Sequence, residues 1–409
     1  MKIMPLNSYQ YINFKAGRTE VLSDFDGTFM PKEYNHDVIC NDNPPVDKDS
    51  FGSYFGCFKK FLDDDKKTSL TISTGRNLFE FNYYMDKIRQ KGLEIPCPDK
   101  LIITNGGDEF IRNKDVDYFK SSASMFNLSD RNRQKSKELS AYTVSYDENK
   151  ARIAVQKMLK NIKGSPIVFQ PETHQGMFGY KGNMTLQERL EKNRYPVNYV
   201  SMRNDGHYQI RLTTANGSPY AEELKKIPLE LEKSGYKLSV QINEFDDETF
   251  VNSINAPKTI ERGMSINIKP ETKGKVKTLD KFHHAKITAD NIMENNTDDL
   301  LIVCGDGRND LDVLNLSNYF DDMQTYEDFS KEEYREEVKK LPVFSIFVRN
   351  SSALDDITSK FESIFNFDGV KRFIIVDKND PERPDTLLDA IKLAQEEYSK
   401  VNPYYEKSK

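Results

Sequence analysis

The chain has 409 residues, of which 37% are hydrophobic and 30% are charged, and its formal net charge is -6 at pH 7. This length allows two domains with a buried core, and 25 phenylalanines and 21 tyrosines are too many for a disordered chain. The acidic balance, without a basic stripe or a polybasic run, argues against nucleic acid and against an anionic membrane as the main partner.

The cysteines and the N-terminal residues indicate the cellular compartment in which the protein is expected. The four cysteines are scattered, without a CxxC pair or a histidine at zinc-ligand spacing, which argues against a structural zinc site and a disulfide framework. The sequence MKIMPLNSYQYINFKAG has no apolar segment typical of a signal peptide, and no apolar run reaches membrane-spanning length. We therefore expect a cytoplasmic protein with reduced thiols.

Four short apolar runs, each ending in small polar residues, predict buried parallel strands. They are residues 21–22 before SDFDGT, 69–72 before STGR, 101–104 before NGGDE and 300–304 before GDGRND. All except the third precede a plausible helix, which favours an α/β sheet. Because ligands bind at the carboxyl ends of the strands in such sheets, the four polar loops are expected to share one edge and one site.

The middle of the chain has a different pattern of predicted helices and strands. This pattern predicts an α+β module inserted into the sheet domain. Helices are expected over 147–162 and 221–235, and strands over 197–202, 208–214, 237–242 and 249–254. We therefore expect a first sheet-domain segment at 1–111, the inserted domain at 112–262, and a second sheet-domain segment with a C-terminal extension at 263–409.

Two stretches lengthen the sheet domain, at 35–56 and 315–342. Neither interrupts a motif, so they can be surface insertions, or they can alter substrate access or mediate self-association. Residues 344–357 and 372–381 are expected to form two further edge strands, which leaves the C-terminal architecture open.

The carboxylates in these loops are the main chemical signal. Asp24 and Asp26 point to the same face of an extended chain, while Phe25 points the other way, and Gly27 permits a sharp turn. Asp306 and Asp310 add two carboxylates at the same sheet edge. Like charges repel unless a cation lies between them, and an all-oxygen set suits Mg²⁺. The sequence therefore predicts a magnesium site.

The motifs DFDGT, TISTGR, KGKVKTL and GDGRNDLDVL, in this order, resemble the four motifs of the haloacid dehalogenase-like phosphohydrolase superfamily. The insertion between the second and third motifs resembles the Cof-type branch with a large α/β cap, whose relatives include sucrose-phosphate phosphatases. The resemblance implies an α/β fold, with a Rossmann-like parallel-sheet core and an inserted α+β cap. It also implies an Mg²⁺-dependent phosphatase whose partner is a small phosphorylated metabolite, of the sugar-phosphate type.

The resemblance also implies roles for the first aspartates. Asp24 would attack the substrate phosphorus and form an aspartyl-phosphate, which water later hydrolyses. Asp26 would protonate the leaving alkoxide and then deprotonate the attacking water. Asp24, the main-chain carbonyl of Asp26, and Asp306 would hold the Mg²⁺. Dehalogenases lack the second aspartate, because a halide needs no proton, so its presence favours phosphate chemistry.

Further positions would bind the phosphoryl group or orient the catalytic groups. Thr74 would offer a hydroxyl to a phosphoryl oxygen, and Lys273 would restrain both Asp24 and the phosphate. Asp310 would orient Lys273 or metal-bound water. The remaining substrate contacts implied by the resemblance are Gly75, Arg76, Asn105, Gly106 and Asn309.

Several of these assignments have alternatives. Lys273 is preferred because the family pattern places a glycine after the lysine, but three other lysines lie nearby, namely Lys269, Lys275 and Lys277. Arg76 can simply begin a helix, and Asn105 and Gly106 can form an ordinary turn.

The function also has rivals. A phosphotransferase or phosphomutase would use the same aspartyl-phosphate, with a sugar hydroxyl in place of water. A metabolite-binding protein could keep the fold without catalysis, although every chemical position of the motifs is present. The sequence leaves the oligomeric state open.

Overall fold

The computed structural model describes residues 17–112, 148–162, 167–170, 200–205, 209–215, 220–245, 263–271, 280–320 and 332–406, apart from 77, 104, 105 and 107. These residues divide into two compact units, one made of the described residues within 1–23, 60–70 and 285–409 and the other of those within 24–59 and 71–284. The domain limits expected from the sequence stay a prediction.

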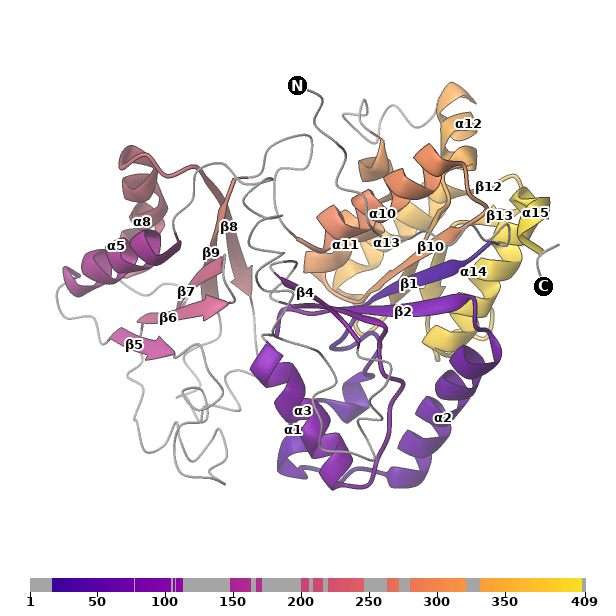
Figure 1. Cartoon of the computed structure of the whole chain (residues 1–409), viewed down its shortest axis with the longest axis horizontal. Coiled ribbons are helices and arrows are strands. Elements are labelled where there is room, and N and C mark those ends of the chain that lie inside the picture. Colours follow the sequence, from indigo (N-terminus) through magenta and orange to yellow (C-terminus); the bar gives the residue numbers. More distant parts are fainter. Residues whose placement is uncertain are drawn as a thin grey trace. The chain divides into compact units, whose positions relative to one another are not determined.

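A seven-stranded sheet forms the centre of the α/β fold (Figure 1). Its order is β14 (Phe373–Val376), β11 (Val343–Val348), β10 (Leu300–Gly305), β1 (Thr19–Asp24), β2 (Thr68–Ser73), β3 (Lys100–Ile103) and β4 (Asp108–Ile111). The pairs β1–β10, β10–β11, β11–β14 and β2–β3 are parallel, whereas β3–β4 is antiparallel. The predicted fold class is confirmed, and so are the four strands predicted from the apolar runs, which are β1, β2, β3 and β10.

The sheet's inner strands read as apolar runs because they are buried on both faces. Every residue of β10 is buried, and so are five of the six residues in β1 and in β2, including the last four of each strand. The two strands expected at the C-terminal end both exist, but the prediction that both are edge strands is wrong. Only β14 is at the edge, since β11 lies between β10 and β14.

Residues 35–56 are part of the hydrophobic core rather than a surface insertion alone. They contain α1 (His36–Asn41) and the first half of α2 (Lys48–Asp64), which leads towards β2. Phe51, Phe55 and Phe58 recur at helical spacing on α2 and are buried. The rings of Phe55 and Phe58 pack on Phe29, with centroids 5.6 and 5.3 Å away, so this helix supports the turn that follows β1.

The C-terminal extension covers the amino ends of β1 and β2, where α14 (Leu387–Val401) and α15 (Pro403–Glu406) bring polar groups into the core. The side-chain amide nitrogen of Gln395 lies 3.0 Å from Oγ1 of Thr19 and 3.1 Å from Oγ1 of Thr68. Tyr405 shares the Thr19 hydroxyl, and burial raises the pKa of this tyrosine to about 12. The extension is therefore a structural part of the sheet domain, at the end of the strands opposite the polar loops.

The remaining helices of the sheet domain complete its layers. They are α3 (Leu78–Gln90), α10 (Lys281–Asn295), α11 (Leu311–Leu314), α12 (Glu332–Lys340) and α13 (Asp355–Phe365), with the small hairpin β12 (Asn366–Phe367) and β13 (Val370–Lys371). Short 3-10 turns occur at η1 (Lys32–Tyr34), η3 (Arg308–Asp310), η4 (Leu316–Tyr319) and η6 (Ser352–Leu354).

A second, five-stranded sheet takes four strands from the region expected to be the inserted domain, 112–262, and its fifth strand, β9 (Gly263–Pro270), from the residues that directly follow it. Its order is β5 (Ile167–Gln170), β6 (Val200–Asp205), β7 (Gln209–Ala215), β9 and β8 (Leu238–Phe245). The helices α5 (Glu148–Lys160) and α8 (Ala221–Lys233) bury apolar side chains against β7 and β9, in one cluster that includes Val155, Leu224 and Ile266. The strand expected at 249–254 lies outside the described residues.

Within the described part of the chain, no helix combines the length and apolar character needed to cross a bilayer.

Candidate functional site

The strand register places the first and fourth motifs at the same edge of the sheet. Asp24 is the last residue of β1, and Asp306 directly follows β10. The two strands are hydrogen-bonded neighbours in a parallel register that pairs Ser23 with Cys304. Because Asp24 ends β1 and Asp306 follows β10, this pairing brings the two aspartates close together at the carboxyl ends of the strands.

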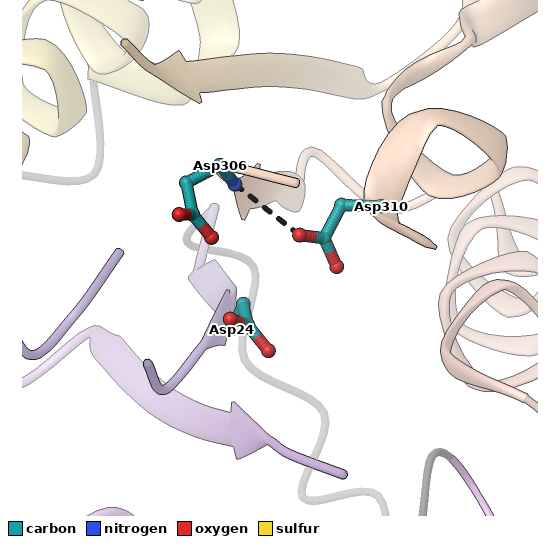
Figure 2. A group of neighbouring side chains, drawn as sticks. All are labelled: Asp24, Asp306 and Asp310. Atoms are coloured by element: carbon teal, nitrogen blue, oxygen red, sulfur yellow. Dashed lines mark hydrogen bonds between the residues drawn. The ribbon is translucent and has the colours of Figure 1, made fainter. Parts of the chain in front are cut away.

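Three carboxylates form one cluster, which Figure 2 shows. Asp24, Asp306 and Asp310 each offer one oxygen, and these oxygens lie within 4.8 Å of one another. Asp24 and Asp310 are buried, with 8% and 1% of their surface exposed, and Asp306 is half-buried. Carboxylates gathered with so little water around them repel strongly, so the cluster favours a hard divalent cation over an empty space.

Asp310 fixes the loop that carries Asp306. Its Oδ2 accepts hydrogen bonds from the backbone N–H of Asp306 at 3.2 Å (Figure 2) and of Gly307 at 3.1 Å. A Cβ atom on Gly305 would lie 2.4 Å from the Cβ of Asp310, closer than real Cβ atoms approach. The glycine that ends β10 therefore leaves room for Asp310 to reach back under the loop.

The turn after β1 separates the two aspartates of the first motif. Gly27 has φ +82°, which confirms the predicted sharp turn, and the N–H of Phe29 donates to the carbonyl of Asp24 at 3.1 Å. Phe25 is fully buried, whereas half of the Asp26 side chain is exposed. The two carboxylates thus differ in environment, one buried in the cluster and the other at the surface.

Arg76 holds the second aspartate. Its Nε and Nη2 donate to the two carboxylate oxygens of Asp26, at 2.9 and 2.7 Å. The guanidinium also stacks on Tyr84, with Cζ 4.9 Å from the ring centroid, and burial raises the pKa of that tyrosine well above its usual value. Arg76 therefore does more than begin a helix. Its contact here is with Asp26, and its role in substrate binding stays a prediction.

Thr74 lies directly after β2 and is buried. Its N–H donates to the carbonyl of Ile102 at 2.8 Å, which ties it to the neighbouring strand β3. Its Oγ1 accepts from the N–H of Arg76 at 3.1 Å, so the hydroxyl hydrogen can be donated elsewhere, as a contact to a phosphoryl oxygen requires. Gly75, between these two residues, is half-buried.

A lysine that the sequence analysis did not consider contacts Asp24. Lys281 is the first residue of α10, is buried, and forms an ion pair with Oδ1 of Asp24. Asp280 precedes it and accepts a hydrogen bond from the N–H of His283 at 3.0 Å, as a residue that caps a helix does. The aspartate before the helix was a usable signal for where α10 begins, and hence for a lysine fixed at its first position.

Two of the predicted site residues lie outside the part of the chain that the structure describes. Lys273, the lysine chosen from the family pattern, lies outside the described residues, and so does Asn105. Asn309 is exposed on the turn η3, next to the cluster's Asp310.

The loop after β3 packs on the start of α10. The carbonyl oxygen of Gly106 lies 3.1 Å from Nε2 of His284, and Oε2 of Glu109 lies 3.4 Å from the other ring nitrogen. Gly106 has φ +102°, and a Cβ there would lie 2.5 Å from the backbone of Asp280. This close approach requires glycine, so Gly106 helps to hold the helix end that carries Lys281.

Comparisons with known proteins found similar structures only. No protein-family model and no curated protein matches the chain. Among solved structures, it is similar to the sucrose-phosphatase from Synechocystis sp. PCC6803, with 12% identity, coverage of 92% of this chain and 97% of that one, and a TM-score of 0.40. The chain is similar in structure to haloacid dehalogenase-like hydrolases.

Two further structures illustrate the same likeness. A HAD/COF-like hydrolase from Plasmodium vivax has 14% identity and a TM-score of 0.37, with 92% of this chain and 95% of that one covered. The C-terminal domain of the C. albicans trehalose-6-phosphate phosphatase has 14% identity and a TM-score of 0.37, with 81% and 83% covered.

Proposed function

We propose that the protein is an Mg²⁺-dependent phosphatase that hydrolyses a small phosphomonoester, of the sugar-phosphate type, through an aspartyl-phosphate on Asp24. The observation that carries the proposal is the three-carboxylate cluster at the ends of β1 and β10, with Lys281 paired to Asp24. The substrate class follows from the resemblance of the four motifs, which occur in family order.

The donor set fits magnesium. All three groups are carboxylates, which are the ligands that Mg²⁺ prefers, and Lys281 supplies one positive charge against three negative ones among these residues. Asp24 and Asp306 would hold the ion, with the main-chain carbonyl of Asp26 as a further ligand. When bound, the ion would neutralise charge on the transferring phosphoryl group and orient it towards the nucleophile.

The proposed reaction has two steps. In the first, a carboxylate oxygen of Asp24 forms a bond to phosphorus while the bond to the ester oxygen breaks, and Asp26 gives its proton to the leaving alkoxide. In the second, Asp26 takes a proton from water, the water oxygen bonds to phosphorus, and the acyl-phosphate bond to Asp24 breaks. The net reaction converts one phosphomonoester and one water into an alcohol and inorganic phosphate.

The environments of the two aspartates support this division. Asp24 is buried and paired with Lys281, which orients it as a nucleophile. Asp26 is half-exposed and is held by Arg76, so it lies at the surface, outside the cluster that contains Asp24. Lys281 and the hydroxyl of Thr74 would both stabilise negative charge on the phosphoryl oxygens.

A panel of phosphorylated metabolites tests the proposal. Phosphate release is measured with Mg²⁺ and with a chelator, for the natural chain, for Asp24→Asn and for Asp356→Asn, an exposed aspartate in α13 that serves as control. We expect turnover that requires the metal, is lost in Asp24→Asn and is unchanged in Asp356→Asn. If no phosphomonoester is turned over with any divalent ion, the proposal is wrong.

A further inference from the structure

The loop after β11 reaches the carboxylate cluster. The register of β10 and β11 pairs Gly305 with Phe347, so the residues that follow the two strands lie at the same sheet edge. Asn350, two residues after the end of β11, is half-buried, and its Nδ2 donates a hydrogen bond to Oδ2 of Asp306 at 2.7 Å. The family motifs assign no role to this asparagine.

The same loop is anchored on its other side. Arg349 donates from Nε to Oδ1 of Asp355 at 2.9 Å, and the same guanidinium donates at 2.5 Å to the second oxygen of Asp355 and to Asp377. Its backbone N–H donates to the carbonyl of Val376 at 3.0 Å. These bonds tie the loop to α13 and to the end of β14, so Asn350 is presented to Asp306 from a fixed backbone.

Two hydrogen bonds, one to its backbone and one to its side chain, therefore help to fix Asp306 in place. Its backbone N–H donates to Asp310, and one of its carboxylate oxygens accepts from Asn350. A neutral amide donor orients the carboxylate without cancelling its charge, whereas a lysine in this place would compete with a cation. The hydrogen bond to Oδ2 orients the carboxylate of Asp306 within the cluster.

We propose that Asn350 is a positioning residue of the metal site, which fixes the rotation of the Asp306 carboxylate so that one oxygen is presented to a divalent cation. This inference rests on the proposed metal-dependent function. It gives the C-terminal part of the chain a role in the site, through a residue that does not touch the reacting atoms. Loss of the amide removes a donor that orients this carboxylate, and loss of a partner that orients a metal ligand typically weakens metal affinity about 10- to 100-fold.

Direct metal binding tests the proposal without relying on turnover. Free Mn²⁺, used in place of Mg²⁺, is measured by electron paramagnetic resonance during titration of the full chain. The variants are Asn350→Leu, which keeps the branched side-chain shape but has no donor, and Asn350→Ala. Ser352→Ala is the matched control, because this serine is exposed in the same loop, and Asp306→Ala shows the effect of losing the ligand itself.

The expected result is a Kd for Mn²⁺ that rises at least about 10-fold in both Asn350 variants, with no change in Ser352→Ala. The midpoint of thermal unfolding without metal should stay close to that of the natural chain, which separates positioning from a purely structural role. Equal Mn²⁺ affinity in the natural chain and both Asn350 variants would overturn the inference and leave the proposed function intact. Loss of cooperative unfolding in both variants would also overturn it, since Asn350 would then be a folding residue.

The failure of the proposed function has a different signature. If the natural chain and Asp306→Ala bind Mn²⁺ equally weakly, the cluster is not a metal site, and the positioning role of Asn350 is overturned with it.

Discussion

Replacing Lys281 by alanine should disturb the site far more than removing a comparable lysine from the same helix. Lys281 and Lys286 both lie on α10, both are buried, and each forms an ion pair with an aspartate. The partners differ, because the Asp24 side chain is 10% exposed whereas that of Asp290 is 38% exposed. Lys286→Ala is therefore a matched control that removes the same stem and the same charge.

The exposure of the aspartate that each lysine contacts determines how much unfolding free energy the variant should lose. Removing one member of a buried ion pair leaves an uncompensated charge and typically costs about 3–5 kcal/mol, and Asp24 would be such a charge. Asp290 can be solvated by water once Lys286 is gone, so this pair should contribute about 1 kcal/mol or less. We expect the two variants to differ by roughly 3 kcal/mol in unfolding free energy without metal.

Thermal unfolding with and without Mg²⁺ measures this difference. Mg²⁺ at about 100 times its Kd stabilises the folded chain by about 2.7 kcal/mol, so it should recover much of the loss in Lys281→Ala. In the phosphatase assay, removing a cation that stabilises transition-state charge should lower kcat by roughly 10²–10³-fold, and Lys286→Ala should be nearly normal.

The comparison can refute the reasoning. If both lysine variants unfold at the same temperature and turn over substrate equally well, the contact between Lys281 and Asp24 has no special role. A large loss in Lys273→Ala with none in Lys281→Ala would return the catalytic assignment to the lysine of the family pattern.

Two further predictions concern the frame of the site. Gly305→Ala should lower the unfolding midpoint and weaken Mn²⁺ binding, because a Cβ 2.4 Å from that of Asp310 forces this buried side chain to move. Gly52→Ala, in α2 where a Cβ meets nothing within 4 Å, should instead be neutral or slightly stabilising, and an equal loss in both would contradict the account. The pKa of Asp377 is held below its ordinary value, first by a backbone N–H two residues on and then by Arg349, so its ionised form stabilises the folded chain. The stability difference between the natural chain and Asp377→Asn, followed by thermal unfolding, should be constant from about pH 5 to 8 and should shrink as the pH falls below about 4. A difference that grows on acidification would be evidence against this assignment.

The parts of the fold that depend on local pattern were predictable. Apolar runs that end in small polar residues identified β1, β2, β3 and β10, because buried parallel strands cannot alternate in polarity. The glycine within the first motif signalled its turn, which has φ +82° at Gly27. The cluster of Asp24, Asp306 and Asp310 followed from strand order, because the carboxyl ends of neighbouring parallel strands meet at one edge.

The parts that depend on tertiary packing were not predictable. Asp280 signals where α10 begins, but the contact between Lys281 and Asp24 also depends on the loop at Gly106, which packs against that point and has no local signal. The pairing of Asp26 with Arg76 joins two separate motifs and has no local signal. Asn350 also gave no local signal, because only the register of β11 beside β10 brings it to Asp306.

The most direct test of the central claim is to locate the phosphoryl group during turnover. The chain is mixed with p-nitrophenyl phosphate and Mg²⁺ and quenched in acid, and borohydride then reduces any aspartyl-phosphate to homoserine, which is identified by mass spectrometry of the peptides. We expect homoserine at position 24 alone, and only when Mg²⁺ is present. Phosphate release without modification at Asp24, or modification at another carboxylate, would contradict the account.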